Sequence, residues 1–308
     1  MFKSGFVNIV GNPNVGKSTL MNELVGERLS IITSKSQTTR HRITGIVNEP
    51  DFQIIFSDTP GVLKPNYKLQ ESMLRFSESA LVDADIVMYI TDVFESAEKN
   101  DDFLDKVRKQ EVPILLLINK IDLSDQDKLT EIVEAWEKRI PQAEIIPCSA
   151  LNKFNTEYIM KRIKELLPEG EAYYDKDALT DKNTRFFIQE IIREKVLIQY
   201  KKEIPYSVEV EVEEYKEDNK RIDIRAIIYV ARNSQKGIIV GHSLGKTALK
   251  AQLEMANEYL TTHTVILGQK ELQDGTIIIR DMESGIQEII DQKKLGNALQ
   301  KIIDSQNK

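Results

Sequence analysis

The stretch that most constrains this chain is residues 9–20, in which Gly11 to Ser18 follow the spacing Gly-x-x-x-x-Gly-Lys-Ser. The apolar run before it, residues 6–10, is typical of a buried strand, and residues 18–25 have the pattern of an amphipathic helix that ends at Gly26. A strand, a glycine-rich loop and a helix predict a phosphate-binding loop, because backbone N–H groups and the helix dipole then face an anion. The residues expected at the phosphates are Gly11, Asn12, Pro13, Asn14, Val15, Gly16, Lys17, which reaches the outer phosphates, and Ser18, which binds Mg²⁺.

Two further stretches predict that the base is guanine. The sequence Asn119-Lys120-Ile121-Asp122 ends the apolar run 112–118, where ligands bind in open α/β sheets. The Asp122 carboxylate can accept hydrogen bonds from the ring N–H and the amine of guanine, and adenine offers no such pair of donors. Ser149-Ala150-Leu151 follows a strand-like run, and its backbone is expected to contact the guanine carbonyl.

Asp58-Thr59-Pro60-Gly61 follows the strand-like run 52–56. We expect Asp58 to hold Mg²⁺ through water and the Gly61 N–H to sense a γ-phosphate. All four residues, Asp58, Thr59, Pro60 and Gly61, are predicted nucleotide contacts.

Residues 34–42 have no apolar periodicity, which indicates a loop between the first helix and the second strand.

These segments, in this order, resemble the translation-factor-related GTPases and, within them, the Era family of bacterial GTPases. The resemblance also includes Ser-Gln-Thr-Thr-Arg-His-Arg at 36–42, and it extends to about Gly241. It implies GTP hydrolysis to GDP, with Mg²⁺ bound by Ser18, Asp58 and a loop threonine. We assign this threonine as Thr39, with Thr38 as the second choice. The residues that it assigns to catalysis are Lys17, Asn14, Thr39 and Gly61.

The position after Gly61 holds Val62, where many regulatory GTPases carry a glutamine that orients the attacking water. Hydrolysis is therefore expected to depend on charge neutralisation and backbone donors, and to be slow. In related GTPases with an apolar residue here, an asparagine at the position of Asn14 helps to bind K⁺. The alternative is that Asn14 only forms the turn in Asn-Pro-Asn.

Strand and helix patterns alternate through residue 168, which predicts an α/β fold with a doubly wound parallel sheet in a GTPase domain, residues 1–168. The acidic, turn-forming residues 169–184 are expected to be a linker. A smaller α+β domain, residues 185–308, is predicted to begin with a helix at 185–202. A hairpin of two alternating strands, 207–213 and 222–230, is expected to follow.

The helix and hairpin resemble the start of the type II KH domain of the Era family, in which a Gly-x-x-Gly loop clamps single-stranded RNA. Residues 185–250 carry 13 Lys or Arg and 10 Asp or Glu, so a mildly basic local site is expected. The loop from Gly241 to Gly245 is one residue longer than the family pattern. Binding through it is therefore open. The candidate RNA residues are Lys236, Gly237, Gly241, His242, Gly245 and Lys246.

From about residue 249 the chain departs from the Era pattern and resembles the end of the anticodon-binding domain of histidyl-tRNA synthetase. The residues that carry this resemblance include Val265-Ile266-Leu267-Gly268 and Arg280-Asp281-Met282. They suggest a helix, a strand and a hairpin. We expect this part to complete a sheet rather than to recognise tRNA.

A length of 308 residues fits two domains, and a net charge of −7 argues that any RNA site is local. The single cysteine, Cys148, excludes an internal disulfide framework and suggests a buried structural thiol. No signal peptide is expected, and no apolar run approaches the length of a membrane span. We expect a mostly monomeric cytoplasmic protein, with membrane contact limited to a peripheral one at the inner face.

By resemblance, the chain is a GTP-hydrolysing switch that binds 16S ribosomal RNA and acts in assembly of the 30S subunit. Two alternatives stay open: a GTPase that has lost KH-type RNA binding, and a tRNA- or RNA-binding module with a regulatory G domain. A P-loop kinase is a further alternative, and the pair Asn119 and Asp122 argues against it.

Overall fold

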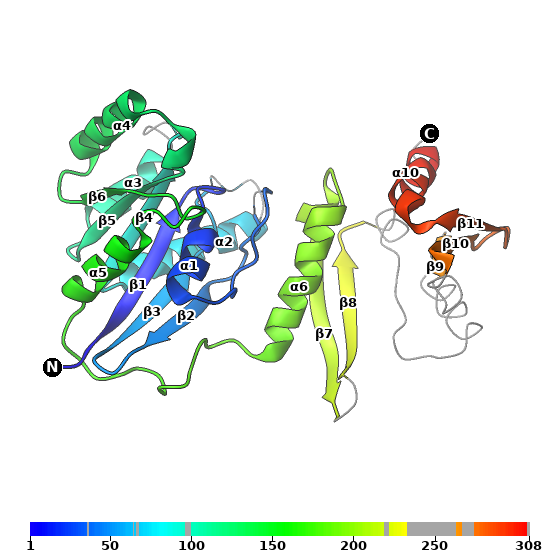
Figure 1. Ribbon diagram of the computed structural model, residues 1–308, viewed down its shortest axis with the longest axis horizontal. Helices are drawn as coiled ribbons and strands as arrows, with labels where there is room; N and C mark the ends of the chain where they lie inside the picture. Colours follow the sequence, from blue (N-terminus) through cyan, green and yellow to red (C-terminus); the bar gives the residue numbers. More distant parts are fainter. Residues whose placement is uncertain are drawn as a thin grey trace. The chain divides into compact units, whose positions relative to one another are not determined.

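The computed structural model describes residues 1–35, 37–63, 65, 68–95, 100–218, 222–232, 263–266 and 274–306. The chain divides into two compact units, Met1–Gln199 and Tyr200–Lys308 (Figure 1). The predicted α/β domain lies in the first unit, and the predicted hairpin lies in the second.

A six-stranded sheet forms the centre of the first unit, with the strand order β2-β3-β1-β4-β5-β6. β3, β1, β4, β5 and β6 run parallel, as the sequence predicts. β2 is antiparallel to β3, so the prediction of a wholly parallel sheet is wrong at this edge. The reason is the short connection between these strands, because a tight turn joins only antiparallel strands. The strands are β1 Lys3–Gly11, β2 Ile43–Asn48, β3 Phe52–Asp58, β4 Ile86–Asp92, β5 Ile114–Asn119 and β6 Glu144–Pro147.

Two apolar layers cover the two faces of this sheet, because successive strand residues point to opposite sides. In β4, Met88 packs in the layer that includes α1 and α5, whereas Tyr89 packs in the layer that includes α2, α3 and α4. Helices on both faces confirm the doubly wound architecture (Figure 1). The helices of this unit are α1 Lys17–Val25, α2 Lys68–Val82, α3 Asp101–Arg108, α4 Gln126–Arg139, α5 Thr156–Leu166 and α6 Thr184–Gln199.

The predicted linker, residues 169–184, is bonded to the sheet. The side chain of Gln53 is fully buried and accepts hydrogen bonds from the backbone N–H groups of Tyr173 and Tyr174, at 2.7 and 3.0 Å. Its amide donates to the Tyr174 carbonyl at 2.8 Å. Further along, the Ile46 N–H of β2 donates to the Leu179 carbonyl at 2.8 Å. The segment therefore follows the edge of the sheet and leads into α6, which belongs to the first unit.

The second unit confirms the hairpin with one wet face. In β7 (Val208–Glu217), which pairs with β8 (Ile222–Val230), Val208, Val210 and Val212 are buried while the glutamates between them are exposed. Strands β9 (His263–Ile266), β10 (Thr276–Asp281) and β11 (Gln287–Asp291) form a separate sheet, with α10 at Leu295–Gln306. The predicted C-terminal strand and hairpin are thus present. Within the described residues they form their own sheet instead of completing that of β7 and β8.

We predict that Gln53→Leu destabilises the first unit, because it keeps the side-chain size but leaves the linker amides without their acceptor. The expected loss is about 2–3 kcal/mol in the free energy of unfolding, measured by urea denaturation. Gln126→Leu, at an exposed position of α4, is the matched control and should change stability little. A Gln53→Leu variant as stable as the wild type would contradict this prediction.

Candidate nucleotide site

The phosphate loop has a backbone that only glycine permits at two points. Gly11 has φ 145°, and a Cβ there would lie 2.1 Å from the Ile90 carbonyl oxygen of β4. Gly16 has φ 99°, and a Cβ there would lie 2.2 Å from the Asn119 side chain of β5. Both φ values lie in the region that side chains other than glycine rarely adopt. The glycines thus let the loop lie directly against the ends of two neighbouring strands.

Lys17 and Asp58 form the buried charged centre of the site. Lys17 is 5% exposed, and its Nζ donates to the Asn12 carbonyl at 2.7 Å. Burial lowers the pKa of Lys17 to about 8, although the Asp58 and Glu95 carboxylates act in the opposite direction. Burial also raises the pKa of Asp58, against the Lys17 charge and the Ser18 and Thr39 hydroxyls. A bound phosphate would supply the negative charge that favours the ammonium form of Lys17.

The three predicted metal ligands converge. Ser18 Oγ lies 2.6 Å from Asp58 Oδ2 and 3.0 Å from Thr39 Oγ1, and Thr39 Oγ1 lies 3.4 Å from the same carboxylate oxygen. Asp58 Oδ1 is buried and has no hydrogen-bond partner in the described part of the chain. Hydroxyl and carboxylate oxygens suit Mg²⁺, which binds through one or two carboxylates together with substrate phosphates. The residues therefore fit Mg²⁺ bound jointly with a nucleotide.

The segment after Asp58 is fixed against the phosphate loop. Thr59 is fully buried, and its hydroxyl donates to the Ile9 carbonyl at 2.7 Å, so this side chain braces β1 and is not available to a ligand. The Pro60 carbonyl accepts from the Ser77 hydroxyl of α2 at 2.8 Å. A Cβ on Gly61 would lie 2.6 Å from the backbone of Pro13. Close contact between the two loops therefore requires glycine at position 61.

Asn119 connects three parts of the site. Its amide donates to the Val15 carbonyl at 2.8 Å, and its side-chain oxygen accepts from the Ala150 N–H at 2.9 Å. Asn119 is 3% exposed, so these bonds are formed out of water. Its first role is to hold the phosphate loop and the Ser149–Leu151 loop together. The motif alone did not predict this bracing role.

The residues predicted to bind guanine lie around Asp122. The Ser149 hydroxyl donates to Asp122 Oδ1 at 2.6 Å, which orients the exposed carboxylate. Lys120 Nζ donates to the Asn14 carbonyl at 2.6 Å and pairs with Asp92 at 2.6 Å. The Leu151 side chain is exposed, and the contact of this loop's backbone with the guanine carbonyl stays a prediction. Cys148 is fully buried and its burial raises the thiol pKa to about 12, as a structural thiol requires.

Asn14 has φ 64°, a left-handed conformation that asparagine tolerates in turns, and its side-chain amide donates to the Ser34 carbonyl at 3.4 Å. This geometry agrees with the turn-forming role. The K⁺ role of Asn14 stays a prediction.

The candidate RNA residues Lys236, Gly237, Gly241, His242, Gly245 and Lys246 lie outside the described residues.

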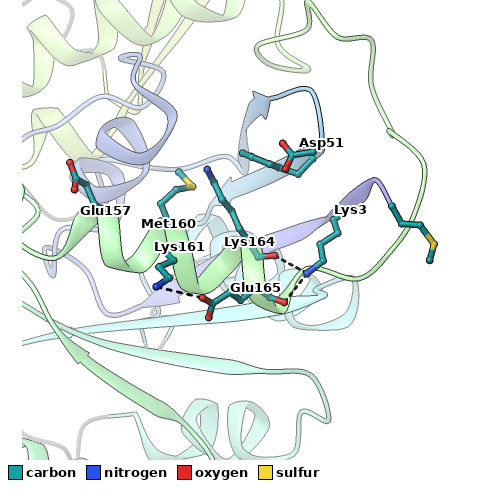
Figure 2. A pocket seen from close by; sticks show the side chains of 9 residues that line it. Lys3, Asp51, Glu157, Met160, Lys161, Lys164 and Glu165 are labelled. Carbon is teal, nitrogen blue, oxygen red and sulfur yellow. Dashed lines mark hydrogen bonds and ion pairs between the residues drawn. The ribbon is translucent and has the colours of Figure 1, made fainter.

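A hollow of about 630 Å³ lies at the other end of β1, away from the phosphate loop (Figure 2). Two of its lysines have partners: Lys3 Nζ donates to the backbone carbonyls of Lys164 and Glu165 at 3.0 and 2.9 Å, and Lys161 Nζ lies 4.0 Å from the Glu165 carboxylate. None of the predicted nucleotide residues lines it. It is therefore separate from the candidate site.

Comparison with known proteins identifies the family. Residues 6–120 match the model of the 50S ribosome-binding GTPase family, and residues 203–259 match a KH domain model. GTPase Era of Staphylococcus haemolyticus is 42% identical over 241 residues, which cover 78% of this chain and 81% of that protein. GTPase Era of Clostridium perfringens is 37% identical over 290 residues, 92% of this chain and 98% of that protein.

The chain belongs to the Era family of GTPases. It is therefore a GTP-hydrolysing enzyme, and the fold predicted from the resemblance is confirmed. The KH match and the Clostridium perfringens alignment both continue beyond Gly241, so the departure predicted there is less complete than the sequence suggested. The resemblance of the C-terminal stretch to a histidyl-tRNA synthetase stays a prediction.

Solved Era structures share this fold. A crystal structure of Era with MgGDPNP and nucleotides 1506–1542 of 16S ribosomal RNA is 34% identical, with a TM-score of 0.74 over 84% of this chain and 90% of that one. An Aquifex aeolicus Era variant bound to GDP.AlF4- is 35% identical, with a TM-score of 0.74 over 84% of this chain and 89% of that one. In the described part of this chain, no helix is long and apolar enough to cross a membrane.

We predict that nucleotide affinity depends on the protonation of Lys17. Below pH 8 the free protein already carries the ammonium, so affinity for GDP should be constant. Above pH 8 binding must take up a proton, and affinity should fall about tenfold per pH unit. Titration calorimetry between about pH 7 and pH 9.5 would measure both the affinity and the proton uptake. Constant affinity across this range would show that Lys17 stays charged without a ligand.

We also predict that Asp122→Asn weakens GTP binding about 100-fold or more and moves preference toward xanthosine triphosphate. The carboxylate accepts two donors that guanine has, whereas an amide can donate to the oxygen that xanthine carries in place of the amine. Competition binding would measure the ratio of the two affinities. Asp127→Asn, at an exposed position of α4, is the matched control. An unchanged preference for GTP would refute the assignment of Asp122.

Proposed function

We propose that this chain is a GTP-controlled switch that binds 16S ribosomal RNA and acts in assembly of the 30S subunit. The observation that carries the enzymatic half is the convergence of Ser18, Thr39 and Asp58 within 2.6–3.4 Å of one another. The match of residues 203–259 to a KH domain supports the RNA-binding half. Era solved with 16S ribosomal RNA shares this fold, which also supports this half.

Each group has a proposed role in hydrolysis. Water attacks the γ-phosphorus and gives up a proton to a phosphate oxygen, the bond to the bridging oxygen breaks, and the products are inorganic phosphate and GDP, which carries the charge that develops on that oxygen. Lys17 neutralises this charge, and the N–H groups of the phosphate loop and of Gly61 orient the phosphates. The Ser18 and Thr39 hydroxyls, and Asp58 through water, would hold a Mg²⁺ ion, which would supply further positive charge at the phosphate oxygens. Val62 is 3% exposed and apolar, so it cannot orient water, and intrinsic hydrolysis is slow.

We propose residues 1–168 as the GTPase domain, 169–184 as the connecting segment and 185–308 as the RNA-binding part. The cytoplasm is the proposed location, with the chain mostly monomeric. The alternative in which KH-type RNA binding is lost is less favoured, because the KH match includes residues 241–245, the predicted loop, and continues to residue 259.

We predict that RNA with the sequence of the small-subunit 3′ end binds this chain most tightly when a GTP analogue is present. Binding should weaken with GDP or without nucleotide, and it should weaken as salt rises because phosphate contacts release counterions. Fluorescence anisotropy at two salt concentrations would measure the affinities.

Two controls sharpen this experiment. A scrambled RNA of equal length tests sequence preference. Lys246→Glu should weaken RNA binding, whereas Lys161→Glu, in the GTPase domain, should not. A chain that hydrolyses GTP but binds the 3′-end RNA no better than the scrambled RNA would contradict the proposed RNA function and leave only the GTPase.

A further inference from the structure

Helix α6, which belongs to the first unit, carries charged residues that are buried. Glu190, Arg193, Glu194 and Leu197 follow the spacing i, i+3, i+4 and i+7, so they share one face of the helix. Their exposed fractions are 5%, 1%, 3% and 1%. Burial of charges is costly unless they are paired and hydrogen-bonded. The contacts that this face makes therefore show which part of the chain α6 fixes in place.

Arg193 joins this face to the loop that carries Thr39. Its Nε donates to Glu190 Oε1 at 2.8 Å, and its Nη2 donates to Glu190 Oε2 at 2.5 Å. The same Nη2 donates to the carbonyl oxygen of Thr38, also at 2.5 Å. A guanidinium held by two parallel bonds to a carboxylate has a fixed orientation. Glu190 therefore aims Arg193 at one backbone carbonyl of the loop.

The Thr38 carbonyl belongs to the peptide group that includes the Thr39 nitrogen. A peptide group is planar and rigid, so fixing this carbonyl also fixes the direction of the bond from the Thr39 nitrogen to its Cα. The Thr39 hydroxyl lies 3.0 Å from Ser18 Oγ and 3.4 Å from Asp58 Oδ2. We propose that Arg193 is a positioning residue that holds Thr39 at the Mg²⁺ site. This inference rests on the proposed role of Thr39 in the GTPase.

Two more contacts hold the same loop against α6. Arg28 pairs with Glu194, and Lys35 Nζ donates to the Leu197 carbonyl. Leu197 lies in the last turn of α6, where carbonyls lack a partner within the helix and a cation is favourable. Arg28, Lys35 and Thr38 are thus each attached to this helix. Of these contacts, only that of Arg193 is adjacent to the predicted metal ligand.

The test uses the full chain and the double variant Glu190→Gln/Arg193→Met, which removes both charges so that neither is left buried alone. Affinities for GDP and for a non-hydrolysable GTP analogue are measured across Mg²⁺ concentrations, together with kcat for GTP. Loss of the partner behind a metal ligand typically costs about 10–100-fold in metal affinity or activity. We expect about a tenfold rise in the Mg²⁺ needed for analogue binding and about a tenfold fall in kcat, with GDP affinity unchanged.

Arg185→Met, an exposed arginine in the first turn of α6, is the matched control and should behave as the wild type. Arg193→Lys keeps the charge but cannot form the two parallel hydrogen bonds to Glu190. Its Mg²⁺ dependence and kcat should therefore lie between those of the wild type and the double variant. A double variant with wild-type Mg²⁺ dependence and kcat would overturn the positioning role. So would parallel losses of GDP and analogue binding, because the pair would then only support the fold. A wild type that does not hydrolyse GTP would instead overturn the proposed function.

Discussion

The site depends on the close approach of the phosphate loop to the ends of β4 and β5. Gly11 and Gly16 allow this approach, since a Cβ at either position would lie little more than 2 Å from a neighbouring atom. The approach brings the Asn119 side chain into contact with the loop, where it bonds to the Val15 carbonyl and to the Ala150 N–H. This close approach thus brings the phosphate loop, the end of β5 and the Ser149–Leu151 loop, which are the segments predicted to bind phosphate and guanine, around one site.

The electrostatics follow from this compactness. Lys17 and Asp58 are both buried. Burial lowers the pKa of Lys17 and raises that of Asp58, and so favours the neutral form of each. Hydroxyls of Ser18 and Thr39 bond to the Asp58 carboxylate and partly offset its burial. A ligand that brings phosphate to Lys17 and a divalent cation to Asp58 would relieve both costs. The same features that make the free site costly therefore favour a nucleotide with its metal.

The motifs predicted a doubly wound sheet with helices on both faces and the residues that meet at the site, because glycine spacing and strand ends restrict where such residues lie. The antiparallel direction of the edge strand β2 was not predicted, because only its short connection to β3 indicates it.

The positioning role of Arg193 was not predicted either. Glu190, Arg193 and Glu194 are charged, so apolar periodicity predicts that their face is exposed, whereas Arg193 and Glu194 bond to partners 155 and 166 residues away. Gln53 and the segment that it holds were missed for the same reason.

The most direct test of the site is a crystal structure of the full chain with Mg²⁺ and a non-hydrolysable GTP analogue. The predicted result has Ser18 and Thr39 hydroxyls both bound to Mg²⁺, Asp58 hydrogen-bonded to a metal-bound water, and Arg193 on the Thr38 carbonyl. A structure in which Mg²⁺ is bound without Thr39, or in which Asp122 does not contact the base, would contradict the assignment of these residues.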